Sequence, residues 1–395
     1  MAAPDPLRRG TGAVIGELRG AVFHGPRRPL AIERLRLDPP GPGEVSVRMA
    51  ASGVCHSDLH VVDGEWARPE GVVLGHEGAA VVESLGEGVA ERFPELRPGA
   101  LVVLAWTAPC GACPSCRRGE GWQCARPVAP GHRLRDDLVR VHRADGTPIG
   151  TYSGIGTFGS AQVVAAEAAI PIDPRTPLEV AALIGCAVTT GVGAVLETAR
   201  VRPGASVVIV GLGGVGLSAL LGAVLAGASP IVALDTRREK VDLARSLGAT
   251  AAIRVLPDDP AGTATLVRST LERLGAGPEG GADHVLECIG LPATAELAVE
   301  LTRPGGTTTL VGMTPQGERA SIDVYRFVED GKRLLGSNYG SSVPAIAFPR
   351  LARLHVDGRL PVDRLVSERI RLEDVDAALD AMRRGDGARR VIVYD

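Results

Sequence analysis

The sequence predicts an α/β protein in which a β-rich domain is interrupted by a second domain built on a doubly wound parallel sheet. Short β-type runs between Gly and Pro turns fill residues 20–188, and strands then alternate with helices over residues 189–329. The chain ends in one more strand-like run, "VIVYD", so residues 330–395 are expected to rejoin the first domain. Residues 1–19 are expected to form a flexible extension. This arrangement leaves a cleft between the two domains.

Composition narrows the class of protein. The chain has 395 residues, 45% of them hydrophobic, and a net charge of −3, without the basic excess that a nucleic-acid partner requires. Its longest apolar runs are interrupted by glycine well before the roughly 20 residues that span a membrane. The N-terminus lacks a secretory apolar core, so we expect a cytoplasmic location. Seven cysteines without an export signal favour metal-binding or catalytic thiolates over disulfides.

The elements of each domain follow from local pattern. In the first domain, β-type runs are expected at 30–37, 43–53, 78–86 and 100–106. In the second domain, a buried strand, a glycine turn, a helix and a second strand are expected between 206 and 235. The alternation continues with helices at 240–249 and 295–306 and with strands at 250–255, 283–290 and 307–313.

The glycine turn "GLGGVG" has the spacing of a dinucleotide-binding motif. It follows an apolar strand and begins a helix, and Asp235 ends the next strand nineteen residues after Gly216. Gly211 would permit the tight turn, Gly213 the approach of a pyrophosphate, and Gly216 close packing of helix on strand. The helix N-terminus, at Gly214 and Val215, offers free N–H groups to the phosphates.

Asp235 would bind the adenosine ribose and favour NAD over NADP, although Arg237 and Arg238 beside it could accept a 2′-phosphate. The alternative is a glycine-rich turn of another α/β fold, with Asp235 merely exposed at a strand end.

Four of the seven cysteines lie in one short loop with the spacing C-x2-C-x2-C-x7-C, at Cys110, Cys113, Cys116 and Cys124. Four thiolates make a closed tetrahedral Zn²⁺ site with no position open for substrate, which is the arrangement of a structural zinc. An iron–sulfur cluster is the alternative, but such runs usually continue with a cysteine three residues on, followed by proline. We therefore favour a structural zinc.

A second group of possible ligands is dispersed along the first domain. The segments "SGVCHSDLH", "VLGHEGAA" and "LIGCAVTTG" offer Cys55, His76 and Cys186. Two cysteines and one histidine would give a three-ligand zinc site with an open fourth position, as a catalytic metal requires. Spacing alone leaves the alternative open that Cys186 is a buried small side chain and His76 an ordinary core or surface histidine.

These motifs together resemble the zinc-dependent medium-chain alcohol dehydrogenase family, in the right order from about Gly20 to Asp395. The resemblance implies a GroES-like catalytic domain with an inserted Rossmann domain, two zinc ions per chain and NAD as cofactor. It also implies Cys55, His76 and Cys186 as ligands of the catalytic zinc.

The resemblance further implies roles for the residues around the catalytic zinc. Ser57 takes the proton from the substrate oxygen and passes it, through a cofactor ribose hydroxyl, to His60 at the surface. A histidine suits this role because the unperturbed pKa of an imidazole lies near neutrality. Asp58 bonds the far nitrogen of His76. Glu77 lies beside the zinc and assists ligand exchange. A solvated His60 and a salt-bridged Glu77 are the structural alternatives.

The family match also assigns residues to the cofactor and the substrate. His56, Thr190, Lys240 and Arg390 match cofactor-binding positions, with a solvated surface charge as the alternative for Lys240 and Arg390. Trp66, Trp106 and Phe158 match positions that line the substrate pocket, with core packing as the alternative.

The expected activity is hydride transfer between a primary or aromatic alcohol, or its aldehyde, and NAD. A thiol-adduct dehydrogenase of the formaldehyde type ranks lower because the pocket segments show no clear basic and acidic pair for a thiol carrier. A double-bond reductase and a non-catalytic nucleotide-binding protein rank lower still, because Ser57, His60 and the zinc ligands are all present.

The segment 126–158 resembles the nitrosoaniline-dependent branch of the family, in which tightly held cofactor is reoxidised by an external electron acceptor. The family also implies a homodimer or homotetramer, expected to form through the sheet edge near residues 310–314.

Overall fold

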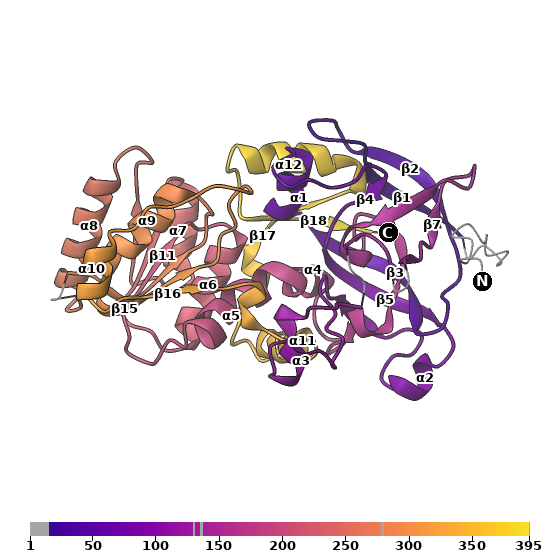
Figure 1. The fold of residues 1–395 in the computed structure, drawn as a ribbon, viewed down its shortest axis with the longest axis horizontal. Helices are drawn as coiled ribbons and strands as arrows, with labels where there is room; N and C mark the ends of the chain where they lie inside the picture. Colours follow the sequence, from indigo (N-terminus) through magenta and orange to yellow (C-terminus); the bar gives the residue numbers. More distant parts are fainter. Residues whose placement is uncertain (1–15, 129–130, 135–136, 278–279, 395) are drawn as a thin grey trace.

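The structure, a computed structural model, describes residues 16–128, 131–134, 137–277 and 280–394. It confirms the predicted α/β fold: Figure 1 shows the parallel sheet with its helices in one lobe and the barrel and second sheet in the other, with yellow C-terminal elements between them. A flexible extension was expected over residues 1–19. Residues 1–15 lie outside the described residues, and residues 16–19 belong to the first strand.

The first lobe is β-rich. Among the described residues, a closed barrel has the order β1 (Gly16–Phe23), β2 (Ala31–Leu37), β7 (Val141–His142), β8 (Pro148–Thr151) and β4 (Val72–Val73). Beside it lies a sheet of order β10 (Ala169–Pro171), β6 (Leu101–Leu104), β5 (Glu77–Leu85), β3 (Glu44–Gly53), β18 (Arg389–Val393) and β17 (Val366–Ile370), with β9 (Ala161–Ala165) also on β3. The helices of this lobe are α1 (His56–Val62), α2 (Val89–Arg92), α3 (Pro114–Arg117), α11 (Pro344–Val356) and α12 (Val375–Arg383).

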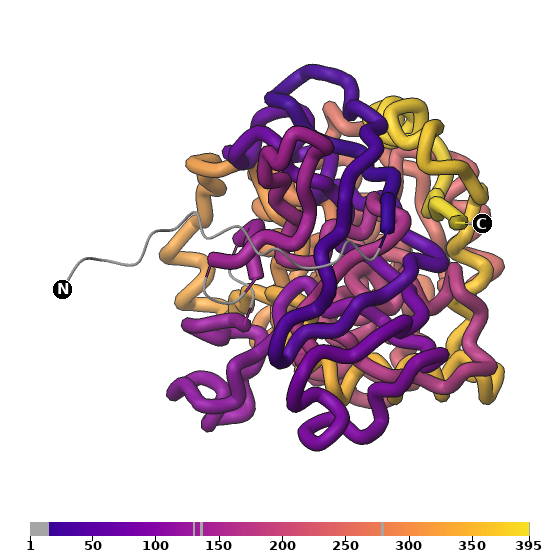
Figure 2. Tube along the Cα trace, turned by 90° about the vertical axis from the view of Figure 1, so that its right-hand side faces the viewer, coloured from indigo at the N-terminus to yellow at the C-terminus, as the bar shows by residue number. Residues whose placement is uncertain are grey.

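The C-terminal strand returns to the first lobe as expected, because β18 pairs antiparallel with β3. Figure 2 shows the indigo N-terminal strands facing the viewer and the yellow C-terminal segments running along one side of them. Two distant parts of the sequence therefore build one domain.

The second lobe is a parallel sheet with helices on its faces. The strand order is β13 (Ala251–Arg254), β12 (Ile231–Asp235), β11 (Val207–Val210), β14 (Ala282–Glu287), β15 (Thr302–Leu310) and β16 (Arg333–Gly336), with every neighbouring pair parallel. The helices are α6 (Gly214–Leu225), α7 (Arg238–Ser246), α8 (Pro260–Arg273), α9 (Pro292–Leu301) and α10 (Val324–Glu329). Strand β11 is apolar and fully buried, as a central parallel strand requires.

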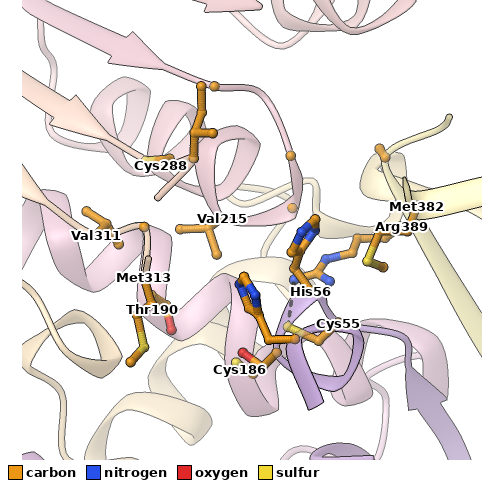
Figure 3. A pocket seen from close by; sticks show the side chains of 18 of the residues that line it. Cys55, His56, Cys186, Thr190, Val215, Cys288, Val311, Met313, Met382 and Arg389 are labelled. Carbon is orange, nitrogen blue, oxygen red and sulfur yellow. Dashed lines mark hydrogen bonds between the residues drawn. The ribbon is translucent and has the colours of Figure 1, made fainter. Parts of the chain in front are cut away.

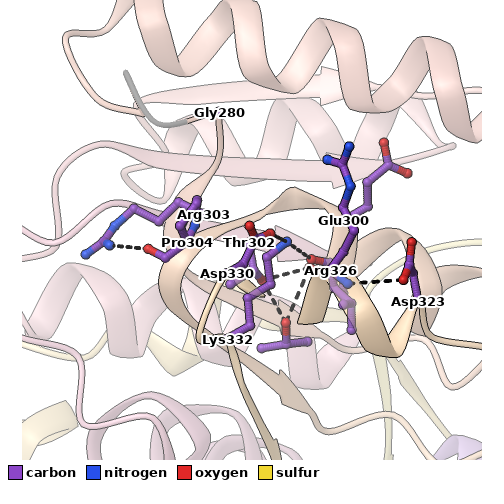
Figure 4. Close-up of polar contacts among 12 residues, drawn as sticks. Gly280, Glu300, Thr302, Arg303, Pro304, Asp323, Arg326, Asp330 and Lys332 are labelled. Carbon is purple, nitrogen blue, oxygen red and sulfur yellow. Dashed lines mark hydrogen bonds and ion pairs between the residues drawn. The ribbon is translucent and has the colours of Figure 1, made fainter. Parts of the chain in front are cut away.

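The parallel sheet extends past residue 329, where the inserted domain was expected to end. Strand β16 pairs with β15 through Leu310↔Gly336, so the edge of the sheet is β16 and not the expected segment near 310–314. Polar contacts hold the start of β16 (Figure 4): Lys332 donates to the carbonyl oxygen of Val299 at 3.1 Å and lies 3.3 Å from the carboxylate of Asp330.

A long helical stretch joins the lobes. It consists of α4 (Leu178–Leu183), η5 (Ile184–Val188), α5 (Thr189–Gly193) and η6 (Ala194–Thr198), and it runs across the expected boundary at 188/189. By length and composition this stretch could cross a membrane, but 83% of its most apolar window is buried inside the protein. Close packing explains the burial: a Cβ at Gly191 would lie 2.3 Å from the carbonyl oxygen of Val215 in α6.

Candidate active site

The cysteine loop forms one of two possible metal clusters among the described residues. The sulfur atoms of Cys110, Cys113, Cys116 and Cys124 all lie within 4.8 Å of one another. Backbone N–H groups point at two of these sulfurs, with Cys110 N 3.3 Å from Cys124 Sγ and Cys113 N 3.3 Å from Cys110 Sγ. Four thiolates with N–H donors fit a closed tetrahedral zinc.

The second cluster gathers residues that are far apart in the sequence. Cys55 precedes α1, His76 and Glu77 lie at the start of β5, and Cys186 lies in the helical stretch between the lobes. All four are buried, and their ligand atoms lie within 4.8 Å of one another. His76 Nε2 and Glu77 Oε2 are buried and, among the described residues, have no hydrogen-bond partner. This donor set fits a zinc ion, and Glu77 offers it a further oxygen.

Asp58 fixes the orientation of the His76 ring in this cluster. Its fully buried carboxylate lies 3.1 Å from His76 Nδ1 and accepts hydrogen bonds from the backbone N–H groups of Gly75 and Cys55, both at 3.2 Å. Because Nδ1 faces Asp58, Nε2 is left to face the two cysteine sulfurs.

Arg389 is a buried residue of this site that the sequence analysis missed. Its guanidinium lies 3.1 Å from the Glu77 carboxylate, donates to the carbonyl oxygen of Val54 at 2.9 Å and lies 3.8 Å from Cys55 Sγ (Figure 3). Burial raises the pKa of Glu77 to about 8, although Arg389 opposes that rise. The predicted Arg390 is next in sequence and is less buried, with its guanidinium 2.8 Å from Glu368.

A cavity of about 760 Å³ lies between the lobes and reaches both the metal cluster and the glycine turn. Most of the residues singled out in the sequence line it: Cys55, His56, Ser57, His60, Trp66, His76, Trp106, Cys186, Thr190, Gly211, Gly213, Gly214, Val215, Asp235, Lys240 and Arg390. Figure 3 shows Cys55, Cys186 and His56 close together, with Thr190 and Val215 on the side of the parallel sheet.

Phe158 does not line this cavity, contrary to the sequence-based assignment. Its side chain is 0% exposed and belongs to the hydrophobic core of the barrel. It packs behind the turn before His76, where a Cβ at Gly75 would lie 2.5 Å from Phe158 Cδ1. The aromatic residue that reaches the cavity from this segment is Tyr152, whose ring lies 5.6 Å from that of His76.

The glycine turn has the shape of a dinucleotide cradle. Gly211 has a φ of +92°, and α6 begins at Gly214 with its N-terminus toward the cavity. A Cβ at Gly213 would meet nothing within 4 Å in the described chain, which leaves space for a pyrophosphate. Asp235 ends β12, and its carboxylate accepts hydrogen bonds from Leu212 N at 2.8 Å and Arg237 N at 2.9 Å.

Ser57 and His60 lie on α1 and line the cavity. His60 is only partly exposed: its ring stacks on Trp66 at 4.5 Å, and its Nδ1 bonds the carboxylate of Glu65. Glu65 is 41% exposed and was not singled out in the sequence, where a loop carboxylate carries no signal of this contact.

Comparisons with known proteins agree with this geometry. The chain matches the alcohol dehydrogenase GroES-like domain over residues 41–174 and the zinc-binding dehydrogenase family over residues 214–355. It is 36% identical over 381 residues to an S-(hydroxymethyl)glutathione dehydrogenase of Escherichia coli, a match that covers 95% of this chain and 99% of the relative.

Solved structures of similar proteins have the same architecture. An alcohol dehydrogenase zinc-binding domain protein from Burkholderia ambifaria superposes with a TM-score of 0.88 at 34% identity, covering 96% of this chain and 99% of that one. Benzyl alcohol dehydrogenase from Acinetobacter calcoaceticus gives 0.85 at 29%, covering 96% and 100%. Acetophenone reductase from Geotrichum candidum, in complex with NAD, gives 0.75 at 26%, covering 97% and 99%.

The fold, the two metal clusters and the dinucleotide cradle define a zinc-binding dehydrogenase. The chain belongs to the zinc-binding medium-chain alcohol dehydrogenase family, with a GroES-like domain and a Rossmann-type sheet. It is an oxidoreductase of the zinc-dependent alcohol dehydrogenase type that uses a nicotinamide cofactor and a small-molecule substrate.

Proposed function

We propose that the protein oxidises the adduct of formaldehyde with a thiol, using NAD. The observation that carries this proposal is the 36% identity, over 95% of this chain, to S-(hydroxymethyl)glutathione dehydrogenases. These relatives favour the thiol-adduct activity over the simple alcohol activity that the sequence ranked first. A cavity of about 760 Å³ can accept a substrate that is longer than a simple alcohol.

The reaction is an oxidation of a hydroxymethyl group. The hydroxymethyl carbon transfers a hydride to the nicotinamide, its hydroxyl loses a proton, and an S-formyl thiol and NADH form. Cys55, His76 and Cys186 would hold a zinc ion, which would supply a Lewis acid that lowers the pKa of a hydroxyl group. Ser57 accepts the proton and His60 carries it away, a role supported by the position of both side chains on the cavity wall.

Glu65 extends this proton path. His60 bonds the Glu65 carboxylate through Nδ1, and Glu65 is exposed to solvent. The imidazole can therefore accept a proton on Nε2 and release the proton on Nδ1 to Glu65.

The experiment that tests the proposal is NAD reduction by formaldehyde in the presence and absence of thiols. Turnover that requires both formaldehyde and a thiol such as glutathione or cysteine is the expected result. NAD reduction with free alcohols but not with any formaldehyde–thiol mixture would refute it.

Oxidation of aromatic primary alcohols is a second candidate. It is supported by Trp66, Trp106 and Tyr152 on the cavity wall and by the likeness to benzyl alcohol dehydrogenase. Benzyl alcohol, assayed under the same conditions as the thiol adducts, ranks the two activities by kcat/KM.

We also propose, from the likeness of segment 126–158 to the nitrosoaniline-dependent branch, that NAD stays bound and is reoxidised in place by an external acceptor. Buried Arg389 supports tight binding, because its Nε lies against the glycine turn and, among the described residues, has no partner. Cofactor that remains after gel filtration, together with turnover that needs an added acceptor, is expected. Free NADH that accumulates during turnover would contradict this.

We propose a homodimer or homotetramer in the cytoplasm. Self-association through edge strand β16 is supported by the exposed side chains of Leu334, Val324, Tyr325 and Val328 on β16 and the adjacent α10. Light scattering measures the molar mass in solution, which should be two or four times that of one chain. We further propose the predicted division into two domains, with the second boundary moved beyond residue 336.

A further inference from the structure

One wall of the cavity carries an arginine that pairs with no carboxylate of the described residues. Arg68 lines the same cavity as Cys55 and His76. Its guanidinium donates to the carbonyl oxygen of Ala67 at 2.8 Å, and none of the ion pairs among the described residues includes it. The cavity therefore holds a positive charge that the described protein does not neutralise.

Tyr152 connects this charge to the metal cluster. The guanidinium carbon of Arg68 lies 5.8 Å from the centre of the Tyr152 ring. The same ring meets the His76 ring edge-on, with 5.6 Å between centroids. Tyr152 is only 6% exposed, so a buried ring contacts both the guanidinium of Arg68 and the ring of His76.

His132 completes the surroundings of Tyr152. Its ring stacks on the Tyr152 ring at 5.7 Å, and its Nδ1 is buried without a hydrogen-bond partner in the described part of the chain. Burial and the neighbouring Arg68 lower the pKa of His132 to about 4, so the imidazole is neutral at pH 7. His132 therefore adds no positive charge beside Arg68.

Arg68 is partly exposed, and a guanidinium that has no carboxylate partner among the described residues is free to pair with a bound anion. The planar guanidinium matches a carboxylate through two parallel hydrogen bonds, which fixes the orientation of the bound group. We propose that Arg68 binds a carboxylate at the non-reacting end of the substrate, while the hydroxymethyl group lies at the metal cluster. The protein therefore prefers anionic hydroxymethyl compounds over neutral ones of the same shape.

This inference rests on the proposed function only in that a hydroxymethyl group is oxidised. The carboxylate can belong to a thiol carrier or to a free hydroxy acid, and matched substrate pairs distinguish the two sources. One pair is 4-(hydroxymethyl)benzoate and 4-methylbenzyl alcohol. The other is formaldehyde with 3-mercaptopropionate and formaldehyde with 2-mercaptoethanol.

Wild-type protein is expected to favour the carboxylate member of each pair that it oxidises. Arg68→Met should lower kcat/KM for that member about tenfold to a hundredfold, mainly through KM, and change the neutral member by less than about twofold. Arg68→Lys should retain part of the preference because it keeps the charge but loses the two-pronged geometry. Arg97→Met, at an exposed position outside the cavity, is the matched control and should change neither.

A binding measurement keeps the test independent of turnover. Calorimetry with 4-methylbenzoate and 4-methylbenzamide on zinc- and NAD-loaded protein should show tighter binding of the acid in wild type, and no such difference in Arg68→Met. Equal binding of acid and amide by wild type, or a preference that survives Arg68→Met, would overturn the proposal. Preference within the benzyl pair with no turnover of thiol adducts would refute the thiol-adduct function and leave the carboxylate site standing.

Discussion

Gly213, the N-cap of α6, and Gly216, in its first turn, should respond differently to substitution by alanine: the first should lose cofactor affinity and the second should lose stability. A Cβ added at Gly216 would lie 1.8 Å from the carbonyl oxygen of Gly211, a backbone atom that cannot move aside without moving the turn. A Cβ added at Gly213 would meet nothing within 4 Å in the described chain. Gly213 has φ −72° and ψ −171°, a conformation that alanine adopts without strain.

The magnitudes follow from these two environments. Gly216→Ala overpacks the turn, which costs about 1–3 kcal/mol, and the better helix propensity of alanine offsets at most about 1 kcal/mol of that loss. Gly213→Ala should change the stability of the cofactor-free protein by less than about 1 kcal/mol, because the gain from restricting the unfolded chain is offset by the weaker N-cap preference of alanine. The same methyl group occupies the approach to the pyrophosphate, so NADH affinity should fall about tenfold or more, that is, by at least about 1.4 kcal/mol.

Urea unfolding of the zinc-loaded, cofactor-free protein measures the first effect, and NADH fluorescence titration measures the second. Gly16→Ala is the control, because its Cβ also meets nothing within 4 Å among the described residues and it lies outside the cavity. A Gly216→Ala variant with the wild-type unfolding midpoint, or a Gly213→Ala variant with wild-type NADH affinity, would refute the reasoning.

The remaining predictions concern the metals and the barrel. Cys113→Ser should release one zinc per chain and lower the melting temperature before it affects the chemical step; full loss of turnover at wild-type stability and assembly would contradict the structural role. Cys55→Ala should abolish turnover while metal analysis still finds the other zinc, and an active variant with one zinc would disprove the assignment. Glu33 on β2 pairs with Arg143 at 2.7 Å, which lowers its pKa, so Glu33→Gln should cost about 1–2 kcal/mol at pH 7. That stability is present above the ordinary pKa of about 4.5 and is lost as the pH falls through the lower folded pKa, so urea midpoints of the two proteins should converge in acid.

Local patterns were sufficient to predict the strand, turn and helix that we propose to hold the cofactor. The glycine turn lies between β11 and α6, its neighbours in sequence, so a strand, a turn and a helix could be read from consecutive residues. The cysteine loop is equally local, because its four sulfurs meet within one short segment. The order of the strands was harder to predict from sequence. Strand β16 covers the edge of β15 because, after α10, the chain returns to the sheet and runs parallel to β15.

Side-chain direction was the main property that the sequence could not give. Arg389 and Arg390 are adjacent on a strand, where successive side chains point to opposite faces, and only the pairing of β18 with β3 decides which one is buried. Tyr152 and Phe158 pose the same problem, since both are aromatic and close in sequence. The cavity receives Tyr152 because a turn follows β8 there, whereas Phe158 packs into the barrel core.

Arg389 connects the glycine turn to the metal cluster. Its guanidinium touches Glu77 and approaches Cys55 Sγ, and a Cβ at Gly214 would lie 1.8 Å from its Nε. Only glycine at position 214 therefore lets this arginine pass between α6 and the metal ligands. The Glu77 carboxyl group lies 3.1 Å from this guanidinium and gives it a buried hydrogen-bond acceptor. One side chain from the last strand thus contacts both the glycine turn of the parallel sheet and the candidate metal cluster of the other lobe, and both border the same cavity.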